Sequence, residues 1–224
     1  ARGGAALSLR ATVGKPIKLI NAPLRDYIPV YIGAEGPKNV AQTIEIADGW
    51  LPIFFSPYRT DIYKDAIAKA KPGFEIACTV TTIVNPDVRA AMNFVKMSLG
   101  FYLGGMGAKD KNFHLDLARR LGWGAEADKV QELFLAGRRQ EAFAAVPDEM
   151  ADETALLGPP ARIRERLEAW KKSPVTTLMV TARDRSGQTD GQITLQFHGD
   201  NTELRSWDVI DATGARTRIS LTDI

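Results

Sequence analysis

The segment with the clearest chemical potential is a glycine-bearing turn after the apolar run Ile28–Gly33. Pro37 would occupy the first position of a following helix. A helix N-terminus offers free N–H groups and a favourable dipole to an anion, and glycines let a phosphate approach the backbone. An ordinary tight turn is the alternative, and Glu35 would oppose an anion unless its side chain faced solvent. The candidate phosphate-binding residues are Gly33, Ala34, Glu35, Gly36, Pro37 and Lys38.

A second candidate lies at the end of the aromatic run Trp50–Phe55. In parallel α/β folds, ligands bind at the carboxyl ends of the strands. Phe54, Phe55 and Ser56 therefore become a candidate wall for a flat, ring-shaped substrate or cofactor. Core packing beneath the helices is the alternative, and the sequence alone favours it.

A third candidate is the glycine cluster Gly104–Gly107, which Lys109 and Lys111 follow. A glycine-rich loop beside lysines can clasp an anionic group or form part of a lid. A helix-to-helix linker with solvated charges is the alternative that the sequence favours.

Other site chemistries find little support. His114 and His198 have no partner at metal-ligand spacing, so a zinc or iron site is disfavoured. Cys78 lies in an apolar run and is interpreted as a buried, inert thiol. One acidic segment is interpreted as a solvated helix or loop edge without an acid/base pair. Its carboxylates are Asp148, Glu149, Asp152 and Glu153.

The elements that must position these residues alternate between strand and helix patterns. Apolar runs predict four strands, and helices are expected between and after them. Such alternation predicts parallel βαβ units and an α/β fold. The expected strands are 28–33, 50–55, 74–84 and 175–181, and the expected helices are 37–47, 59–71, 88–102, 112–121, 125–136, 138–145 and 160–170.

Composition narrows the classes of partner. The 224 residues carry a formal net charge of +2, which gives no overall electrostatic footprint for nucleic acid or an anionic membrane. A single cysteine excludes an intramolecular disulfide. No apolar stretch approaches the roughly 20 residues that span a bilayer, and residues 1–10 show no signal peptide. A cytoplasmic protein acting on a small-molecule substrate is expected.

The end of the chain has a different pattern. Residues 183–190 are polar and glycine-bearing, which is typical of a linker. Residues 191–224 alternate apolar and polar side chains around a turn at 211–214, which predicts a short antiparallel β-meander tail.

Several segments resemble the luciferase-like monooxygenase superfamily, most closely its coenzyme F420-dependent oxidoreductase branch. The resemblance covers about residues 14–182 and its motifs occur in the family's order. The matching segments are 28–40, 45–52, 104–107, 111–113, 145–149, 157–160 and, for the last barrel strand, 175–178.

This resemblance implies a (β/α)₈ barrel that binds a deazaflavin or flavin at the carboxyl ends of its strands and transfers hydride to or from the ring. Gly33–Pro37 match the turn whose backbone holds the phosphate-bearing side chain of the cofactor. Phe54–Ser56 match a strand end on the substrate side. Coenzyme F420 is the expected cofactor, and FMN is the alternative.

The resemblance begins partway through the family pattern. Four parallel strands make about half of an eight-stranded barrel, which typically needs about 250 residues. The expected fold is therefore the second half of a TIM-type barrel over residues 1–182, followed by the linker and the tail. Residues that contact the ring and substrate lie in the missing half, so the catalytic residues are unknown.

Three functions follow from this reading. The first is an F420- or flavin-dependent oxidoreductase, truncated and weakly active or inactive alone. The second is a non-catalytic half-barrel fragment or chimera that at most self-associates, as a homodimer. The third gives the function to the tail. Residues 190–224, notably 204–214 and 216–217, are similar to the carboxyl-terminal strands of the periplasmic outer-membrane lipoprotein carrier family. This resemblance implies a strand module that binds lipid or adds to a sheet edge.

Overall fold

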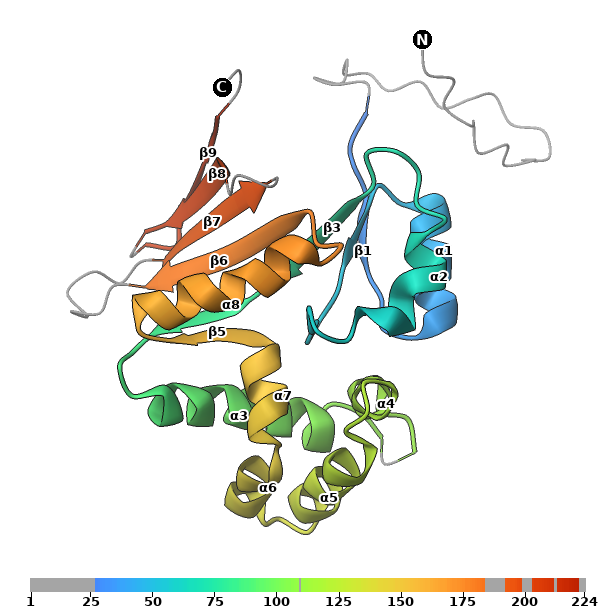
Figure 1. Ribbon diagram of the computed structural model, residues 1–224, viewed down its shortest axis with the longest axis vertical. Coiled ribbons are helices and arrows are strands. Elements are labelled where there is room, and N and C mark those ends of the chain that lie inside the picture. The colour runs from blue at the N-terminus through green and yellow to red at the C-terminus, as the bar shows by residue number, and fades with distance from the viewer. Residues whose placement is uncertain (1–26, 109, 184–191, 199–202, 212, 222–224) are drawn as a thin grey trace.

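The computed structural model describes residues 27–108, 110–183, 192–198, 203–211 and 213–221 (Figure 1). Strands and helices alternate through most of this chain, and strands alone follow α8. The elements are β1 (Tyr31–Gly33), α1 (Pro37–Ile46), β2 (Gly49–Leu51), the 3₁₀ helix η1 (Thr60–Tyr63), α2 (Lys64–Ile67), β3 (Glu75–Thr79), β4 (Thr81–Val84), α3 (Val88–Gly105), α4 (Phe113–Arg120), α5 (Gly124–Leu135), α6 (Arg139–Ala145), α7 (Asp148–Glu153), β5 (Ala155–Gly158), α8 (Pro160–Lys172), β6 (Thr177–Arg183), β7 (Gln192–His198), β8 (Glu203–Ile210) and β9 (Arg216–Ser220).

The main sheet has seven strands in the order β1-β2-β3-β6-β7-β8-β9. The first four pair in parallel, with Ile32 opposite Trp50 and Cys78 opposite Leu178. Helices cover this parallel part, as parallel strands require because both of their faces are apolar. The predicted α/β class is confirmed.

Two boundaries differ from the sequence prediction. The strand expected over 74–84 breaks at Val80, whose N–H donates to Met179 at 3.1 Å. Its second part, β4, leaves the main sheet and pairs in parallel with β5. The short strand β5 was not anticipated, because four residues between two helices carry too little periodicity. Burial of all four residues of β5 and its pairing with β4 select the extended conformation.

The strand expected over 50–55 is also shorter. β2 ends at Leu51, directly before Pro52, which has no N–H to continue a ladder. Phe54–Ser56 therefore lie in the loop beyond the carboxyl end of β2. The helix expected over 59–71 is reduced to the single turns η1 and α2.

A helical layer, α3–α7, lies below the sheet in Figure 1. Its central helix, α3, is capped by Asp87, whose carboxylate accepts the N–H of Ala90 at 3.0 Å. Close contact between α3 and α5 depends on glycine: a Cβ on Gly104 would lie 2.4 Å from the Cβ of Phe134. Small residues on α3 thus set the spacing of the layer.

Cys78 lies in the core between the sheet and its helices. The residue is 1% exposed, and burial raises the pKa of its thiol to about 12. A thiol that stays protonated at neutral pH is a weak nucleophile, so the interpretation of Cys78 as inert is confirmed.

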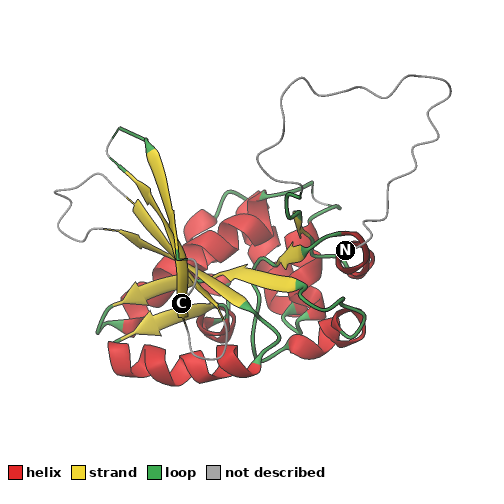
Figure 2. Cartoon of the chain, turned by 90° about the horizontal axis from the view of Figure 1, so that it is seen from above, coloured by secondary structure: helices red, strands yellow, loops and turns green. Residues whose placement is uncertain are grey.

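The last three strands form an antiparallel extension of the sheet. β7 pairs with β6 from Thr177–His198 to Arg183–Gln192, and β8 and β9 follow in sequence order. Figure 2 shows these strands projecting beyond the helices. Asp208 is buried between Arg216 and Arg218, which hold the pKa of its carboxyl well below its usual range.

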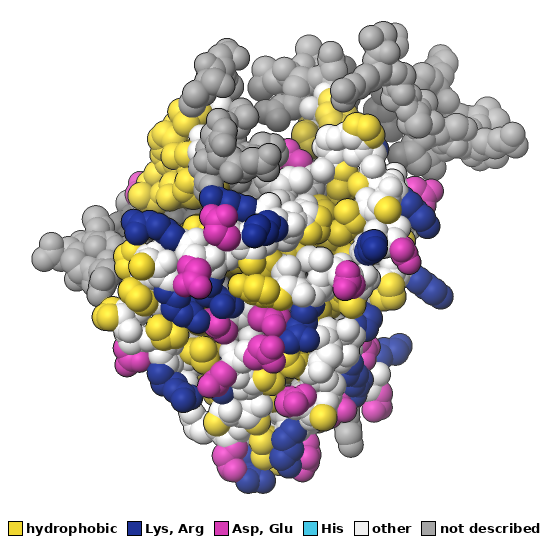
Figure 3. All heavy atoms as spheres, in the orientation of Figure 1, with side chains coloured by type: hydrophobic (Ala, Val, Ile, Leu, Met, Phe, Trp, Pro, Cys, Tyr) yellow, Lys and Arg dark blue, Asp and Glu magenta, His cyan; other side chains and the backbone are white. Residues whose placement is uncertain are grey.

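The surface is mixed in charge. Figure 3 shows Lys and Arg interspersed with Asp and Glu over one face of the helical layer. This pattern agrees with the small net charge of +2. No helix within the described ranges is long and apolar enough to cross a membrane.

The contact at Gly104 yields a stability prediction. We expect Gly104→Ala to destabilise the fold by about 1–3 kcal/mol, because the added methyl group overlaps Phe134 and the helices must separate. Urea unfolding measures the effect. Gly124→Ala is the control, because its new Cβ would meet Arg119 at an ordinary 3.5 Å. Equal stability of the two variants would contradict the packing role of Gly104.

Candidate functional site

The predicted phosphate-binding turn joins β1 to α1. Gly33 ends the strand, and Pro37 begins the helix as expected. Gly36 is the N-cap residue, and no side chain caps the helix. The first turn of α1 therefore has backbone N–H groups that no side-chain cap occupies, which is the arrangement that favours an anion.

The carbonyl groups of this turn are held by hydrogen bonds from the surrounding protein. The indole Nε1 of Trp50 donates to the carbonyl of Ala34 at 2.8 Å, and the Nη2 atom of Arg120 donates to the carbonyl of Glu35 at 2.9 Å. The carbonyl of Gly36 accepts the first helical N–H of α1 at 2.9 Å. Three successive peptide groups are thus oriented by hydrogen bonds to their oxygen atoms.

A surface cavity of about 430 Å³ opens in front of the turn. It lies at the carboxyl ends of β1 and β2, where parallel α/β folds bind ligands. Its volume falls in the range of small-molecule sites, roughly 300–1,000 Å³. The lining residues are Gly33, Ala34, Glu35, Gly36, Asn39, Leu51, Ile53 and Phe113.

Gly36 is open toward this space. Its φ angle of −71° suits any residue, and a Cβ at this position would meet no atom of the described residues within 4 Å. The fold itself therefore does not require glycine here. An open backbone at the cavity wall fits a phosphate that approaches the N–H groups closely.

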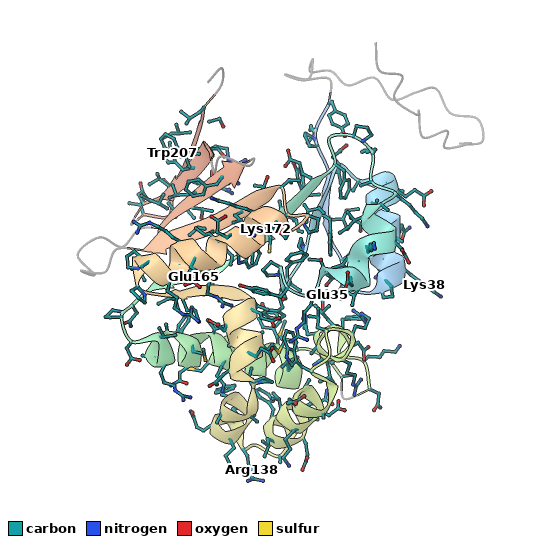
Figure 4. All side chains as sticks on the ribbon, in the orientation of Figure 1. Glu35, Lys38, Arg138, Glu165, Lys172 and Trp207 are labelled. Atoms are coloured by element: carbon teal, nitrogen blue, oxygen red, sulfur yellow. The ribbon has the colours of Figure 1, made fainter. Side chains whose placement is uncertain are left out.

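The side chains of Glu35 and Lys38 point in different directions. Figure 4 shows Glu35 on the side of the turn that faces the helical layer and Lys38 on the outer side of α1. The Oε1 atom of Glu35 lies 3.0 Å from Nδ1 of His114, and both side chains are largely buried. The two atoms are close but poorly aligned, and Nδ1 of His114 and Oε2 of Glu35 have no hydrogen-bond partner among the described residues.

The sequence does not indicate His114 as a site residue, because its position in the sequence bears only on metal binding. It lies in the first turn of α4, which Asn112 caps by accepting the N–H groups of His114 and Leu115. The Asn112 side chain also donates to the carbonyl of Leu103 at 2.7 Å, which joins α4 to the end of α3. The local sequence signal is the capping residue Asn112 before Phe113 and His114, which fixes the start of the helix that carries the imidazole ring.

Phe54 completes an aromatic group around His114. Its ring centroid lies 5.1 Å from Tyr102 and 5.9 Å from His114, and Tyr102 lies 4.8 Å from His114. The φ angle of Phe54 is +49°, which is unfavourable for a bulky side chain. Such strain persists only where the surrounding contacts determine it, and it is common at functional sites.

The other two members of the expected substrate wall lie in the core. Phe55 is 1% exposed and packs against Trp50, Tyr63 and Trp170. Ser56 is fully buried and donates to Oε2 of Glu153 at 2.7 Å. Phe54 alone of the three lies beside His114, and the substrate-side assignment of the three stays a prediction.

Glu153 belongs to a buried ion pair that joins the helical layer to the loop after β2. Arg59 donates to both carboxylate oxygens of Glu153, at 2.8 and 3.1 Å. The guanidinium group also lies 4.1 Å from the centre of the Trp123 ring. This pair holds the loop that carries Phe54.

The interpretation of the acidic segment as a solvated edge is therefore wrong for its inner residues. Glu153 is 9% exposed, and Asp152 is half-buried. Every carboxylate of α7 has a basic partner, because the helix lies between basic side chains of neighbouring elements. The pairs are Asp148 with Lys96 and Arg89, Glu149 with Arg59, Asp152 with Arg162 and Arg166, and Glu153 with Arg59.

The glycine cluster has a packing role in this structure. Gly104 and Gly105 end α3 against the ring of Phe134. Lys109 lies outside the described residues, so an anion clasp at this loop stays a prediction. Within the described ranges no group of three or more His, Cys, Asp or Glu residues can hold a metal ion, and the side chain of His198 is outside them.

Comparison with known proteins identifies the family. Luciferase-like monooxygenases match residues 8–177, and the chain belongs to this family. It is 42% identical over 179 residues to a Mycobacterium tuberculosis protein named as a coenzyme F420-dependent oxidoreductase, covering 76% of this chain and 52% of that protein. It is 25% identical over 164 residues to the 5,10-methylenetetrahydromethanopterin reductase of Archaeoglobus fulgidus, covering 68% and 47%.

A solved structure supports the fold. The coenzyme F420-dependent tetrahydromethanopterin reductase of Methanopyrus kandleri superimposes with a TM-score of 0.52 and 22% identity, over 68% of this chain and 44% of that one. The chain spans about half the length of the curated relatives it matches. The family match ends before the tail, whose resemblance to the lipoprotein carrier family stays a prediction.

The Arg59–Glu153 pair yields the second prediction. We expect Glu153→Gln to destabilise the protein by about 2 kcal/mol, because the partly buried guanidinium group of Arg59 loses its buried counter-charge and keeps only the exposed carboxylate of Glu149. Glu149→Gln is the matched control: Glu149 contacts the same arginine but its side chain is 67% exposed, so its loss should cost less than about 0.5 kcal/mol. Chemical denaturation measures both. Equal losses would contradict the buried pair as the anchor of this loop.

Proposed function

We propose that this chain supplies the cofactor-binding part of a coenzyme F420-dependent oxidoreductase. The reaction is a hydride transfer between the deazaflavin ring and a small organic substrate. The relatives named as F420-dependent enzymes support this cofactor. A cytoplasmic location belongs to the same proposal.

The observation that carries the proposal is the turn Gly33–Pro37 at the cavity wall. Its carbonyl groups are held by Trp50 and Arg120, and its glycines leave the backbone open. The residues present thus fit the phosphate-bearing side chain of the cofactor. When bound, the deazaflavin supplies the carbon that accepts or donates hydride. The protein's contribution here is to orient that side chain and, through the apolar Leu51 and Ile53, to limit water beside it.

We further propose that β1, β2, β3 and β6 form the second half of a (β/α)₈ barrel over residues 1–182. Their parallel order and the family match support this assignment. The linker 183–190 and the tail 191–224 would then be an addition to the barrel. In this proposal the chain alone has weak or no activity, because the residues that contact the ring and substrate belong to the other half.

Cofactor titration tests the binding function. We expect reduced and oxidised F420 to bind more tightly than FMN, as measured by fluorescence. Gly36→Ala should weaken F420 binding by at least about tenfold, the equivalent of one charge-assisted hydrogen bond, because its methyl group occupies the approach of the phosphate. Thermal stability should fall only slightly, because the new Cβ meets no atom of the described residues and alanine is a poorer N-cap residue than glycine.

Gly124→Ala, on α5, is the matched control and should leave F420 affinity unchanged. Failure of every cofactor to bind at high micromolar concentration would remove the cofactor role from this chain. Preference for FMN would select the flavin alternative. Binding that Gly36→Ala does not affect would place the phosphate elsewhere.

A second candidate function is self-association as a homodimer, and one observation favours it. β1 has a strand partner on only one side among the described residues. Beside it, Tyr27, Ile28 and Val30 are exposed by 60%, 69% and 52%. An apolar, unpaired strand edge is suited to pairing with another strand.

Light scattering after size exclusion tests this candidate. The expected result is a concentration-dependent dimer that Val30→Lys dissociates, because a charge at the strand edge opposes pairing. Phe94→Lys, at an exposed apolar position on α3, is the control and should leave the dimer intact. A monomer at all concentrations would contradict self-association.

A further inference from the structure

The turn that we propose to bind a phosphate carries a carboxylate of its own. Glu35 is the one charged side chain among the described residues that line the cavity. Its side chain is 16% exposed, so water screens its charge poorly. The N–H groups and the dipole of α1 attract an anion, and a carboxylate at this position reduces the positive potential that they create. A compensating positive charge beside the carboxylate therefore strengthens binding.

His114 occupies the position from which that charge can be supplied. Its Nδ1 atom lies 3.0 Å from Glu35, and its own side chain is 14% exposed. The ring is held by edge-on contacts with Tyr102 and Phe54, and Asn112 fixes the start of its helix. Figure 1 shows α4 directly below the turn between β1 and α1. The imidazole is thus placed rigidly beside the carboxylate.

The other groups near Glu35 do not change charge in the neutral pH range. Arg120 donates to the carbonyl of Glu35 and stays positive. Tyr63, on η1, stays neutral because burial raises the pKa of its hydroxyl. On α4, Asp116 pairs with Arg119, and on α1 the side chain of Lys38 is exposed. Tyr102, on α3, presents a phenol ring to His114.

We propose that His114 is a positioning residue of the phosphate-binding turn: when protonated it neutralises Glu35 and makes the turn receptive to the phosphate-bearing side chain of the cofactor. This inference rests on the proposed function. Histidine side chains titrate between about pH 5 and 8. A protonated imidazole compensates the carboxylate, and a neutral imidazole leaves it uncompensated. Cofactor affinity therefore falls with increasing pH.

The test is a thermodynamic cycle measured across the pH range. Dissociation constants for F420 and FMN are determined by fluorescence between pH 5.5 and 8.5 for the native protein, His114→Gln, Glu35→Gln and the double variant. Native affinity should fall roughly tenfold over this range, the size of effect that a unit charge exerts over a few ångströms at an intermediate dielectric. His114→Gln should be as weak at every pH as the native protein is at pH 8.5.

Glu35→Gln separates electrostatics from structure. It removes the charge that opposes the anion and also the group that favours a charged imidazole. Its affinity should equal the native value at pH 5.5 throughout the range. The double variant should match Glu35→Gln, because His114 matters only while the carboxylate is present. A merely structural role for His114 would leave the double variant as weak as His114→Gln.

Three outcomes would overturn the inference. Overlapping pH curves for the native protein and His114→Gln would remove the role of the imidazole, and weaker binding by Glu35→Gln would reverse the role of the carboxylate. Both leave the proposed function intact. Failure of every variant to bind at every pH would overturn the proposed function and this inference together. Thermal unfolding of each variant, measured in parallel, identifies any loss of fold.

Discussion

The hydrogen bond from Trp50 to the carbonyl of Ala34 determines where the turn after β1 lies. Trp50 is fully buried, so its indole N–H must find a partner inside the protein. The partner is the carbonyl of Ala34, which follows the neighbouring strand β1 and lines the cavity. The same hydrogen bond therefore links the packing of the core to the shape of the cavity. Edge-on contacts with Phe55 and Tyr63 hold the indole in turn. A substitution in the core that moves the indole of Trp50 would therefore also move the turn after β1.

The short helix α7 has a similar role for the helical layer. Its carboxylates pair with basic side chains of α3, α8 and the loop after β2, which the inner pair of Glu153 with Arg59 reaches. Charged groups in such positions gain little from each other beyond their desolvation cost, but they fix orientation because an alternative packing would leave a charge unpaired. The strained conformation of Phe54 is maintained by this kind of restraint.

Local patterns in the sequence predicted much of this fold. Pro37 marked the start of α1, and the alternation of apolar runs with helical patterns predicted the parallel strands. The break at Val80 and the strand β5 were not predictable, because both depend on which distant strand offers a partner. The same is true of the site. Local sequence identified the turn, but the proximity of His114 to Glu35 arises from the packing of α4 below α1.

The two outer edges of the sheet differ in chemical character. At one edge, the three residues of β1 follow apolar, exposed neighbours. At the other, β9 reads Arg216-Thr217-Arg218-Ile219-Ser220 and is exposed along its length, with two arginines directed to the buried Asp208. Cationic edge strands resist the addition of further strands. Among the described residues, the edge of the sheet at β9 is therefore better protected against further strand pairing than the edge at β1.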